Sequence, residues 1–200
     1  LQTMVKHHRI PIYTSPGTAR QLAYRIAGIE SLLRPVEPGT VFSVGDCRVT
    51  VFRTSHDAAQ SVDYRVDGSA SVGFLTDTGY VTPEAEAALA GVDTLVLESN
   101  HDVEWLRSGP YPYSLKARIL GDEGHLSNDA AAEFACRMAD RGTRQFVLVH
   151  LSRENNTPVR ALDTVGYALR CGGFAGVRLT AAPRGECSEA YIAEGAPCKK

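Results

Sequence analysis

Hydrophobic and polar residues alternate with a period of two over residues 41–76, in short runs separated by polar turns. This period is typical of β-strands that bury one face. The turns, such as Gly45-Asp46 and Asp67-Gly68, contain only a few residues. We therefore predict an antiparallel meander whose strands cover residues 41–44, 47–53, 62–66 and 71–76.

Helical periodicity and short apolar runs alternate over the rest of the chain. Before the meander we expect a helix ending near residue 8, a strand at 10–13 and a helix at about 18–27. After it we expect helices at about 84–90, 102–107, 114–120, 127–141 and 157–170, and strands at 94–97, 146–149 and 177–180. The pattern predicts one mixed α/β domain over residues 1–180, with helices covering a sheet, and a loose polar tail at 181–200.

Length and composition agree with a single folded domain. The 200 residues are 44% hydrophobic and 22% charged, and the net charge is -2. This charge gives the whole molecule no attraction for nucleic acid or an anionic membrane, so a polyanion would have to be held by a local patch. We see no apolar run long enough to span a bilayer and no signal peptide, which favours a cytoplasmic location.

Two further features of the sequence bear on its context. The five cysteines are odd in number and show no C-x-x-C spacing, so we expect reduced thiols rather than disulfides or a zinc ribbon. The chain begins Leu1-Gln2-Thr3-Met4. We expect it to be a fragment of a longer protein.

Side chains that can bind a metal or transfer a proton follow four of the predicted strands. These residues are His56, Asp77, Glu98 and His150. Groups at the carboxyl ends of strands converge on one crevice in α/β sheets, and imidazoles with a carboxylate suit a zinc or manganese site. Alternatively, each side chain could simply cap the loop that follows its strand.

A glycine-flanked loop before the longest predicted helix carries His125. Such a loop can bring an imidazole and backbone amides to a bound anion. In that interpretation Lys116, Arg118 and Ser127 contact a phosphate. In the alternative, Ser127 is a helix N-cap, His125 is a solvated loop residue and the two cations lie on a solvated helix face.

Five short motifs together resemble the metallo-β-lactamase superfamily, and within it the WalJ/YycJ-like branch related to tRNase Z. The resemblance runs in order from Leu1 to about Thr180. The motifs are Thr54-Ser55-His56-Asp57-Ala58, Phe74-Leu75-Thr76-Asp77-Thr78-Gly79, Leu97-Glu98-Ser99-Asn100-His101-Asp102, Gly124-His125-Leu126-Ser127-Asn128 and His150-Leu151-Ser152.

The resemblance implies an αββα sandwich and a site with two divalent metal ions, zinc or manganese. It implies that His56, Asp77 and His150 are metal ligands, with Asp77 bridging the two ions. Glu98 and His125 match the pair that assists proton transfer. Ser152 and Asn155 are candidate substrate contacts.

The sequence departs from the family in one respect, because the motif His-x-His-x-Asp-His is absent. In relatives it lies just before the segment matched by residues 1–13. The resemblance therefore implies an N-terminally truncated sandwich that lacks its first strands. With His56, Asp77 and His150 alone each ion would keep two protein ligands, so we expect weak or no metal binding by this chain.

The function that these expectations favour is a metal-dependent phosphodiesterase, most simply an exonuclease that acts on DNA. A 5′ end would lie near His125, Lys116 and Arg118. Two alternatives stay open. One is hydrolysis of an ester, thioester or lactone on the same fold, and the other is a non-catalytic remnant domain that has lost its main metal motif.

Overall fold

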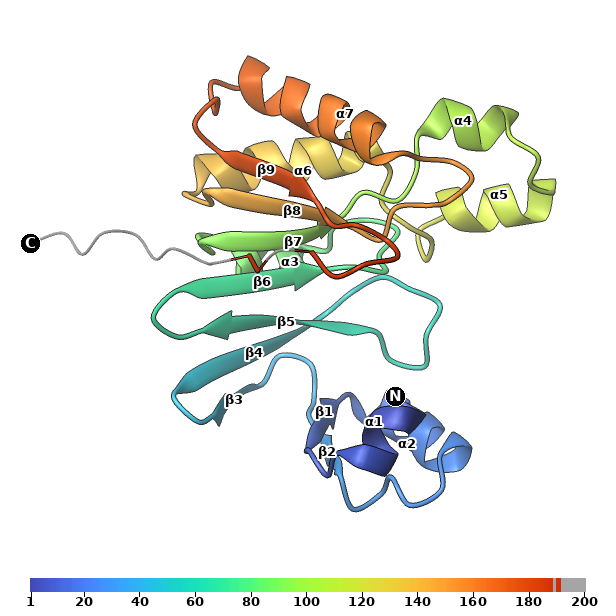
Figure 1. The fold of residues 1–200 in the computed structure, drawn as a ribbon, viewed down its shortest axis with the longest axis vertical. Helices are drawn as coiled ribbons and strands as arrows, with labels where there is room; N and C mark the ends of the chain where they lie inside the picture. The colour runs from blue at the N-terminus through green and yellow to red at the C-terminus, as the bar shows by residue number, and fades with distance from the viewer. Residues whose placement is uncertain (189, 192–200) are drawn as a thin grey trace, which may run out of the picture.

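The computed structural model describes residues 1–188 and 190–191 (Figure 1). A seven-stranded sheet has the order β3-β4-β5-β6-β7-β8-β9, and a separate two-stranded sheet joins β1 and β2. The architecture is mixed α/β, as predicted. The strands are β1 (Ile12–Thr14), β2 (Leu33–Pro35), β3 (Val41–Val44), β4 (Cys47–Arg53), β5 (Val62–Asp67), β6 (Ser71–Leu75), β7 (Thr94–Glu98), β8 (Gln145–Val149) and β9 (Arg178–Ala181).

The pairing directions divide the large sheet into two halves. Strands β3 to β6 pair antiparallel, which confirms the predicted meander. Strands β6 to β9 pair parallel, and β7, β8 and β9 are each reached by a crossover through at least one helix. Because β4 runs in the same direction as β6, the carboxyl ends of β4, β6, β7 and β8 all meet at the right-hand edge of the sheet in Figure 1.

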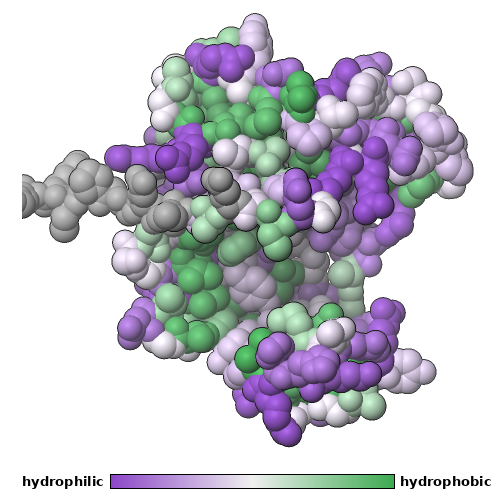
Figure 2. Space-filling model, viewed as in Figure 1, coloured by the Kyte–Doolittle hydropathy of each residue, from purple (hydrophilic) through white to green (hydrophobic). Residues whose placement is uncertain are grey.

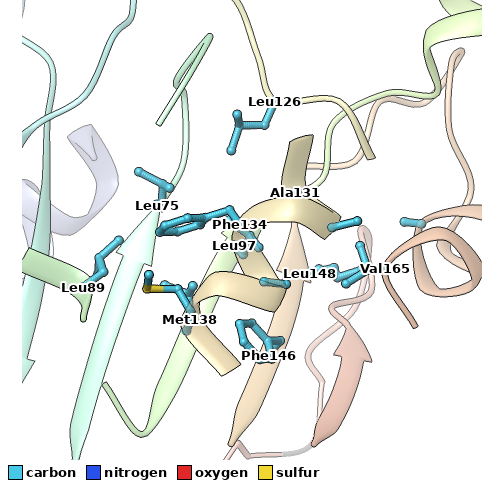
Figure 3. Packing of buried hydrophobic residues seen from close by; sticks show 14 of the residues in the cluster. Leu75, Leu89, Leu97, Leu126, Ala131, Phe134, Met138, Phe146, Leu148 and Val165 are labelled. Carbon is cyan, nitrogen blue, oxygen red and sulfur yellow. The ribbon is translucent and has the colours of Figure 1, made fainter. Parts of the chain in front are cut away.

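The main core lies between the parallel half of the sheet and the helices that cover its far face. Leu75, Leu97 and Leu148 from the strands pack with Phe134 and Met138 of α6, and all five side chains are buried (Figure 3). The helices are α1 (Gln2–His7), α2 (Pro16–Arg25), α3 (Pro83–Leu89), α4 (Val103–Ser108), α5 (Tyr113–Leu120), α6 (Asn128–Asp140) and α7 (Pro158–Cys171). Among the described residues we find no helix with the length and apolar character that crossing a bilayer requires.

The N-terminal segment forms a small lobe beside the carboxyl edge of the sheet (Figure 1). Its strand β1 starts two residues later than predicted, and its helix α2 starts at Pro16 because Ser15 caps it. Strand β2 was not predicted. This strand has three residues, ends in proline and is ordered by parallel pairing with β1, for which a local pattern gives no signal.

The segment predicted as a loose tail begins inside β9, which extends to Ala181. Arg184 then donates hydrogen bonds to the backbone carbonyls of Ser152 and Asn156. Residues 189 and 192–200, including Cys198, lie outside the described residues. The other four cysteines, Cys47, Cys136, Cys171 and Cys187, are free thiols.

Candidate functional site

The four predicted strand-end residues lie together at the carboxyl edge of the sheet. His56 follows β4, Asp77 follows β6, Glu98 is the last residue of β7, and His150 follows β8. The parallel registers place Leu75 beside Leu97 and Glu98 beside Val149, so these turns are adjacent. The loop before α6 adds His125 to the group.

Asp77 and His150 have a backbone conformation that is unusual for residues with a side chain. Their φ angles are +50° and +56°, and no other described non-glycine residue has a positive φ. This conformation costs on the order of 1–3 kcal/mol per residue and persists only where surrounding contacts impose it. Here it turns both side chains back over the ends of β6 and β8, where they meet.

Glu98 holds two of the histidine rings with one carboxylate. It has no exposed surface, and its Oε1 lies 2.8 Å from Nδ1 of His125 and 2.7 Å from Nδ1 of His150. The backbone amides of Thr78 and Leu126 donate to Oε2 at 3.2 and 3.3 Å. Burial raises the pKa of Glu98, but the hydrogen bonds from the two histidines outweigh it and hold that pKa below its ordinary value.

The ionised carboxylate fixes the proton positions on both rings. A carboxylate only accepts hydrogen bonds, so Nδ1 of His125 and Nδ1 of His150 must each carry a proton. The Nε2 atoms are then the ring nitrogens left to bind a metal or to exchange a proton. The hydrogen bond from Glu98 also raises the pKa of His150, although partial burial opposes this.

His56 lies next to His125 and Asp77 in the same group. Its Nδ1 lies 3.1 Å from the carbonyl of Gly124, and its Nε2 lies 3.8 Å from Oδ1 of Asp77. The next residue, Asp57, pairs through Oδ2 with both Nε and Nη2 of Arg118, at 2.7 and 2.5 Å. The Arg118 hydrogen bond holds the pKa of Asp57 below its usual value. Arg118 is thereby fixed at the rim of the site.

The loops that carry the site residues are bound to one another through their backbones. The carbonyl of Ser55 accepts from the amide of Gly79 at 2.8 Å, and the Ser55 hydroxyl donates to the carbonyl of Asp122 at 2.6 Å. A Cβ on Gly79 would lie 2.3 Å from that same carbonyl oxygen. Only glycine allows the loops after β6 and α5 to approach so closely.

A hollow of about 290 Å³ opens beside these loops. Three histidines form its floor, with ring centroids 5.0 Å apart for His56 and His125 and 5.1 Å apart for His125 and His150. Its other lining residues are Asn100, Tyr111, Leu115, Arg118, Ile119, Glu123, Gly124, Leu151 and Ser152. Ser152, predicted as a substrate contact, therefore faces the hollow, and so does Arg118.

The donor set fits a divalent metal ion. Oδ1 of Asp77 lies 3.6 and 3.5 Å from the protonated Nδ1 atoms of His125 and His150, so its carboxylate lies against both rings, whose Nε2 atoms are left to coordinate. Asp77, Glu98, His125 and His150 each offer one ligand atom, and these atoms lie within 4.8 Å of one another. Imidazole nitrogens oriented by a buried carboxylate are the usual arrangement around protein-bound zinc and related ions.

Three other predicted site residues lie outside the hollow. The Lys116 ammonium donates to the carbonyl of Arg107 at 2.7 Å and so ties α5 to α4. Ser127 caps α6, its hydroxyl accepting from the amide of Ala130 at 3.1 Å, which is the alternative that the sequence analysis left open. Asn155 is fully buried, so its side chain supports its loop instead of facing a substrate.

Several residues that shape the site escaped the sequence analysis. Asn100 donates to the carbonyl of His150 at 2.8 Å and lines the hollow. Beneath it, Ser99, Asn128 and Asn156 form a buried network with contacts of 2.6 to 3.1 Å. Ser99, Asn100 and Asn128 lie within the motifs that carry the resemblance, and Asn156 lies shortly after one of them. Their roles were not predictable, because hydrogen-bond partners from distant segments cannot be read from spacing.

Comparisons with known proteins agree with the fold. A family model described as a beta-lactamase superfamily domain matches residues 1–151. Exodeoxyribonuclease YycJ of Bacillus anthracis is 35% identical over 181 residues, which cover 87% of this chain and 67% of that protein. Exodeoxyribonuclease WalJ of Streptococcus pneumoniae is 44% identical over 121 residues, which cover 60% of this chain but only 45% of that protein.

Solved structures show the same fold at low sequence identity. The metallo-beta-lactamase fold protein YhfI of Bacillus subtilis matches with a TM-score of 0.62 at 17% identity, over 90% of this chain and 65% of that one. The Zn²⁺-bound PqqB of Methylobacterium extorquens matches with a TM-score of 0.59 at 18% identity, with the same coverage. This chain thus spans slightly less than two thirds of either solved structure.

Proposed function

Because this chain belongs to the beta-lactamase superfamily, we propose that it carries the active site of a metal-dependent phosphodiesterase, an exonuclease that acts on DNA. The observation that carries the proposal is the convergence of His56, Asp77, His125 and His150 around the buried Glu98 at the carboxyl edge of the sheet. The names of the relatives in Bacillus anthracis and Streptococcus pneumoniae support DNA as the substrate.

In this proposal His56, Asp77 and His150 hold two divalent ions, zinc or manganese. Such ions polarise phosphoryl oxygens and lower the pKa of a bound water. The protein contributes the orientation of its ligands. Glu98 fixes the His150 ring through Nδ1 and leaves Nε2 to coordinate, and the positive φ of Asp77 presents its carboxylate between the histidines.

His125 is our candidate for the proton donor to the leaving oxygen. Its Nδ1 is held by Glu98, so Nε2 is the nitrogen that can transfer a proton, and the ring lines the hollow. Arg118 lines the same hollow, where the part of its guanidinium that does not contact Asp57 would donate a hydrogen bond to a phosphate. We propose a cytoplasmic protein, with which the free thiols of the described cysteines agree.

Digestion of end-labelled DNA by the full product of the gene, including any residues encoded before Leu1, tests this proposal. With Mn²⁺ the protein should shorten the DNA progressively, and a chelator should stop it. Asp77→Asn should lower the rate by more than about a hundredfold, because it removes a charge that the metal site requires. Asp46→Asn, in the exposed turn between β3 and β4, is the matched control and should keep full activity.

Two results would contradict the proposal. One is an Asp77→Asn variant that digests DNA at close to the parental rate. The other is rapid hydrolysis of simple esters, thioesters or lactones by a protein that leaves DNA intact under every metal tested. The second result would assign the same site to a different class of electrophile.

A further inference from the structure

Charge is distributed unevenly between the N-terminal lobe and the rest of the chain. Residues 1–35 contain five lysines and arginines and a single acidic residue, whereas residues 36–200 contain sixteen basic and twenty-two acidic residues. The lobe is therefore a positive region on a negative protein. In the space-filling view it protrudes below the body of the domain, and hydrophilic residues cover much of the face turned to the viewer (Figure 2).

Helix α2 carries two of these five basic side chains, Arg20 and Arg25, and both are exposed. Arg20 and Tyr24, and likewise Gln21 and Arg25, are four residues apart and so lie on neighbouring positions of the helix surface. These four side chains, with Gly17 and Ala59, line a hollow of about 450 Å³. Tyr24 is 93% exposed. Neither arginine forms an ion pair with any residue that the structure describes.

The loop between β4 and β5 connects this hollow to the candidate active site. Its first part carries His56, and its last part contacts α2: Gln60 accepts from the Gly17 amide at 2.9 Å and from the Ser15 hydroxyl at 2.6 Å. A Cβ on Gly17 would lie 2.7 Å from Cβ of Gln60, so the loop and the helix touch directly.

The two sites are close enough for one nucleic-acid strand to contact both. Ala59 comes three positions after His56, and an extended chain of three residues spans at most about 11 Å. Consecutive nucleotides rise about 3.4 Å per step along a strand of a duplex. A strand held at the metal centre therefore reaches the wall of the α2 hollow within a few nucleotides.

We propose that the Arg20–Tyr24–Arg25 surface of α2 binds the single-stranded continuation of the DNA whose end lies at the metal centre. The two guanidinium groups would contact successive phosphates, and the exposed Tyr24 ring would stack on a base. This combination of cations and an aromatic ring is the usual one for single strands without sequence preference. The inference rests on the DNA substrate proposed above and adds where that substrate is held.

The test measures binding of a fluorescein-labelled 20-nucleotide single strand by fluorescence anisotropy. A chelator is present, so that the DNA is not cleaved during the measurement. Arg20→Ala/Arg25→Ala should weaken binding at least tenfold. It should also lower the slope of log affinity against log salt by about 1.4, since each single-strand phosphate contact contributes about 0.7. Tyr24→Ala should weaken binding at least fivefold, whereas Tyr24→Phe should stay within twofold of the parent.

Arg144→Ala/Arg178→Ala is the matched control. It removes the same charge, but from exposed positions at the amino end of β8 and β9, on the opposite edge of the sheet. This variant should bind within twofold of the parent. If both double variants bind alike, or if the protein binds acidic phospholipid vesicles but no DNA, the inference is wrong.

The outcome is separable from that of the proposed function. Binding is measured without metal and digestion is measured with it. If the protein digests DNA and binds it equally well after Arg20→Ala/Arg25→Ala, only the inference that the α2 surface binds DNA is wrong. A protein that binds through Arg20 and Arg25 and digests nothing would overturn only the nuclease.

Discussion

The carboxylate of Glu98 is fully buried and accepts four hydrogen bonds, two from imidazoles and two from backbone amides. Its lowered pKa means that it stabilises the fold above its ordinary value of 4.5, and that this contribution is lost as the pH falls through the folded-state pKa. The pKa of His150 is raised, so its contribution is complete below 6.5 and is lost as the pH rises through the folded-state pKa. Glu98 and His150 together therefore contribute most to the stability of the fold between pH 4.5 and pH 6.5.

Glu98→Gln should separate the charge of this residue from its shape. Without the carboxylate, the pKa of His150 should fall, and NMR titration of its ring protons in a chelator measures that change. Metal affinity should fall by about 10- to 100-fold, as for other groups that orient metal ligands. The control is Glu104→Gln, whose side chain is 79% exposed. An unchanged His150 titration would show that Glu98 does not act on this ring.

At the level of elements, β5 and β6 are joined next to the site by a buried carboxyl group. Asp63 is 8% exposed and accepts from the amide of Thr76 at 2.6 Å, just before Asp77. Burial raises the pKa of Asp63 to about 7. The folded protein then holds a proton that the unfolded chain releases, so this group makes stability fall as the pH rises from 4 to 7, by roughly 4 kcal/mol.

The buried His101 has the opposite effect on stability over nearly the same pH range. It is 1% exposed with neither ring nitrogen hydrogen-bonded within the described structure, and burial lowers its pKa to about 4. Its contribution makes stability rise by about 3 kcal/mol between pH 4 and 6.5. The two effects nearly cancel in the parent protein.

Asp63→Asn should therefore reveal the His101 effect. Relative to the parent, the free energy of unfolding of the variant should increase by about 4 kcal/mol from pH 4 to pH 7. Urea denaturation at several pH values measures it, with Asp46→Asn as the control. Parallel curves for Asp63→Asn and the parent would show that Asp63 is not the group that titrates.

The elements show what the sequence could predict about this site and what it could not. The ends of β4, β6, β7 and β8 were predictable, because apolar runs and turn residues are local signals, and the parallel half of the sheet brings their polar termini together. The directions in which the side chains point were not predictable. Lys116 binds a backbone carbonyl and Asn155 is buried, and both outcomes depend on the packing of α4, α5 and the loop after β8.

For the whole molecule, metal binding and folding are linked because the ligands come from separate segments. The unfolded chain offers no such site, so a metal ion at 100 times its dissociation constant should stabilise the full product of the gene by about 2.7 kcal/mol. This corresponds to a rise in Tm of roughly 5–11 °C for a chain of this size. Thermal unfolding with increasing Mn²⁺ tests it. Asp77→Asn should show no rise, and an equal rise in that variant would place the metal elsewhere.

The order of the strands in the seven-stranded sheet also affects how the protein folds. The β6–β7 pairing joins residue 72 to residue 94, and the β7–β8 pairing joins residue 94 to residue 145. Such distant pairings close large loops and form slowly. During synthesis, His56, Asp77 and Glu98 leave the ribosome well before His150. Asp77 and His150 come together only after β8 has paired with β7, so a metal ion held by both residues stabilises a sheet that is already assembled.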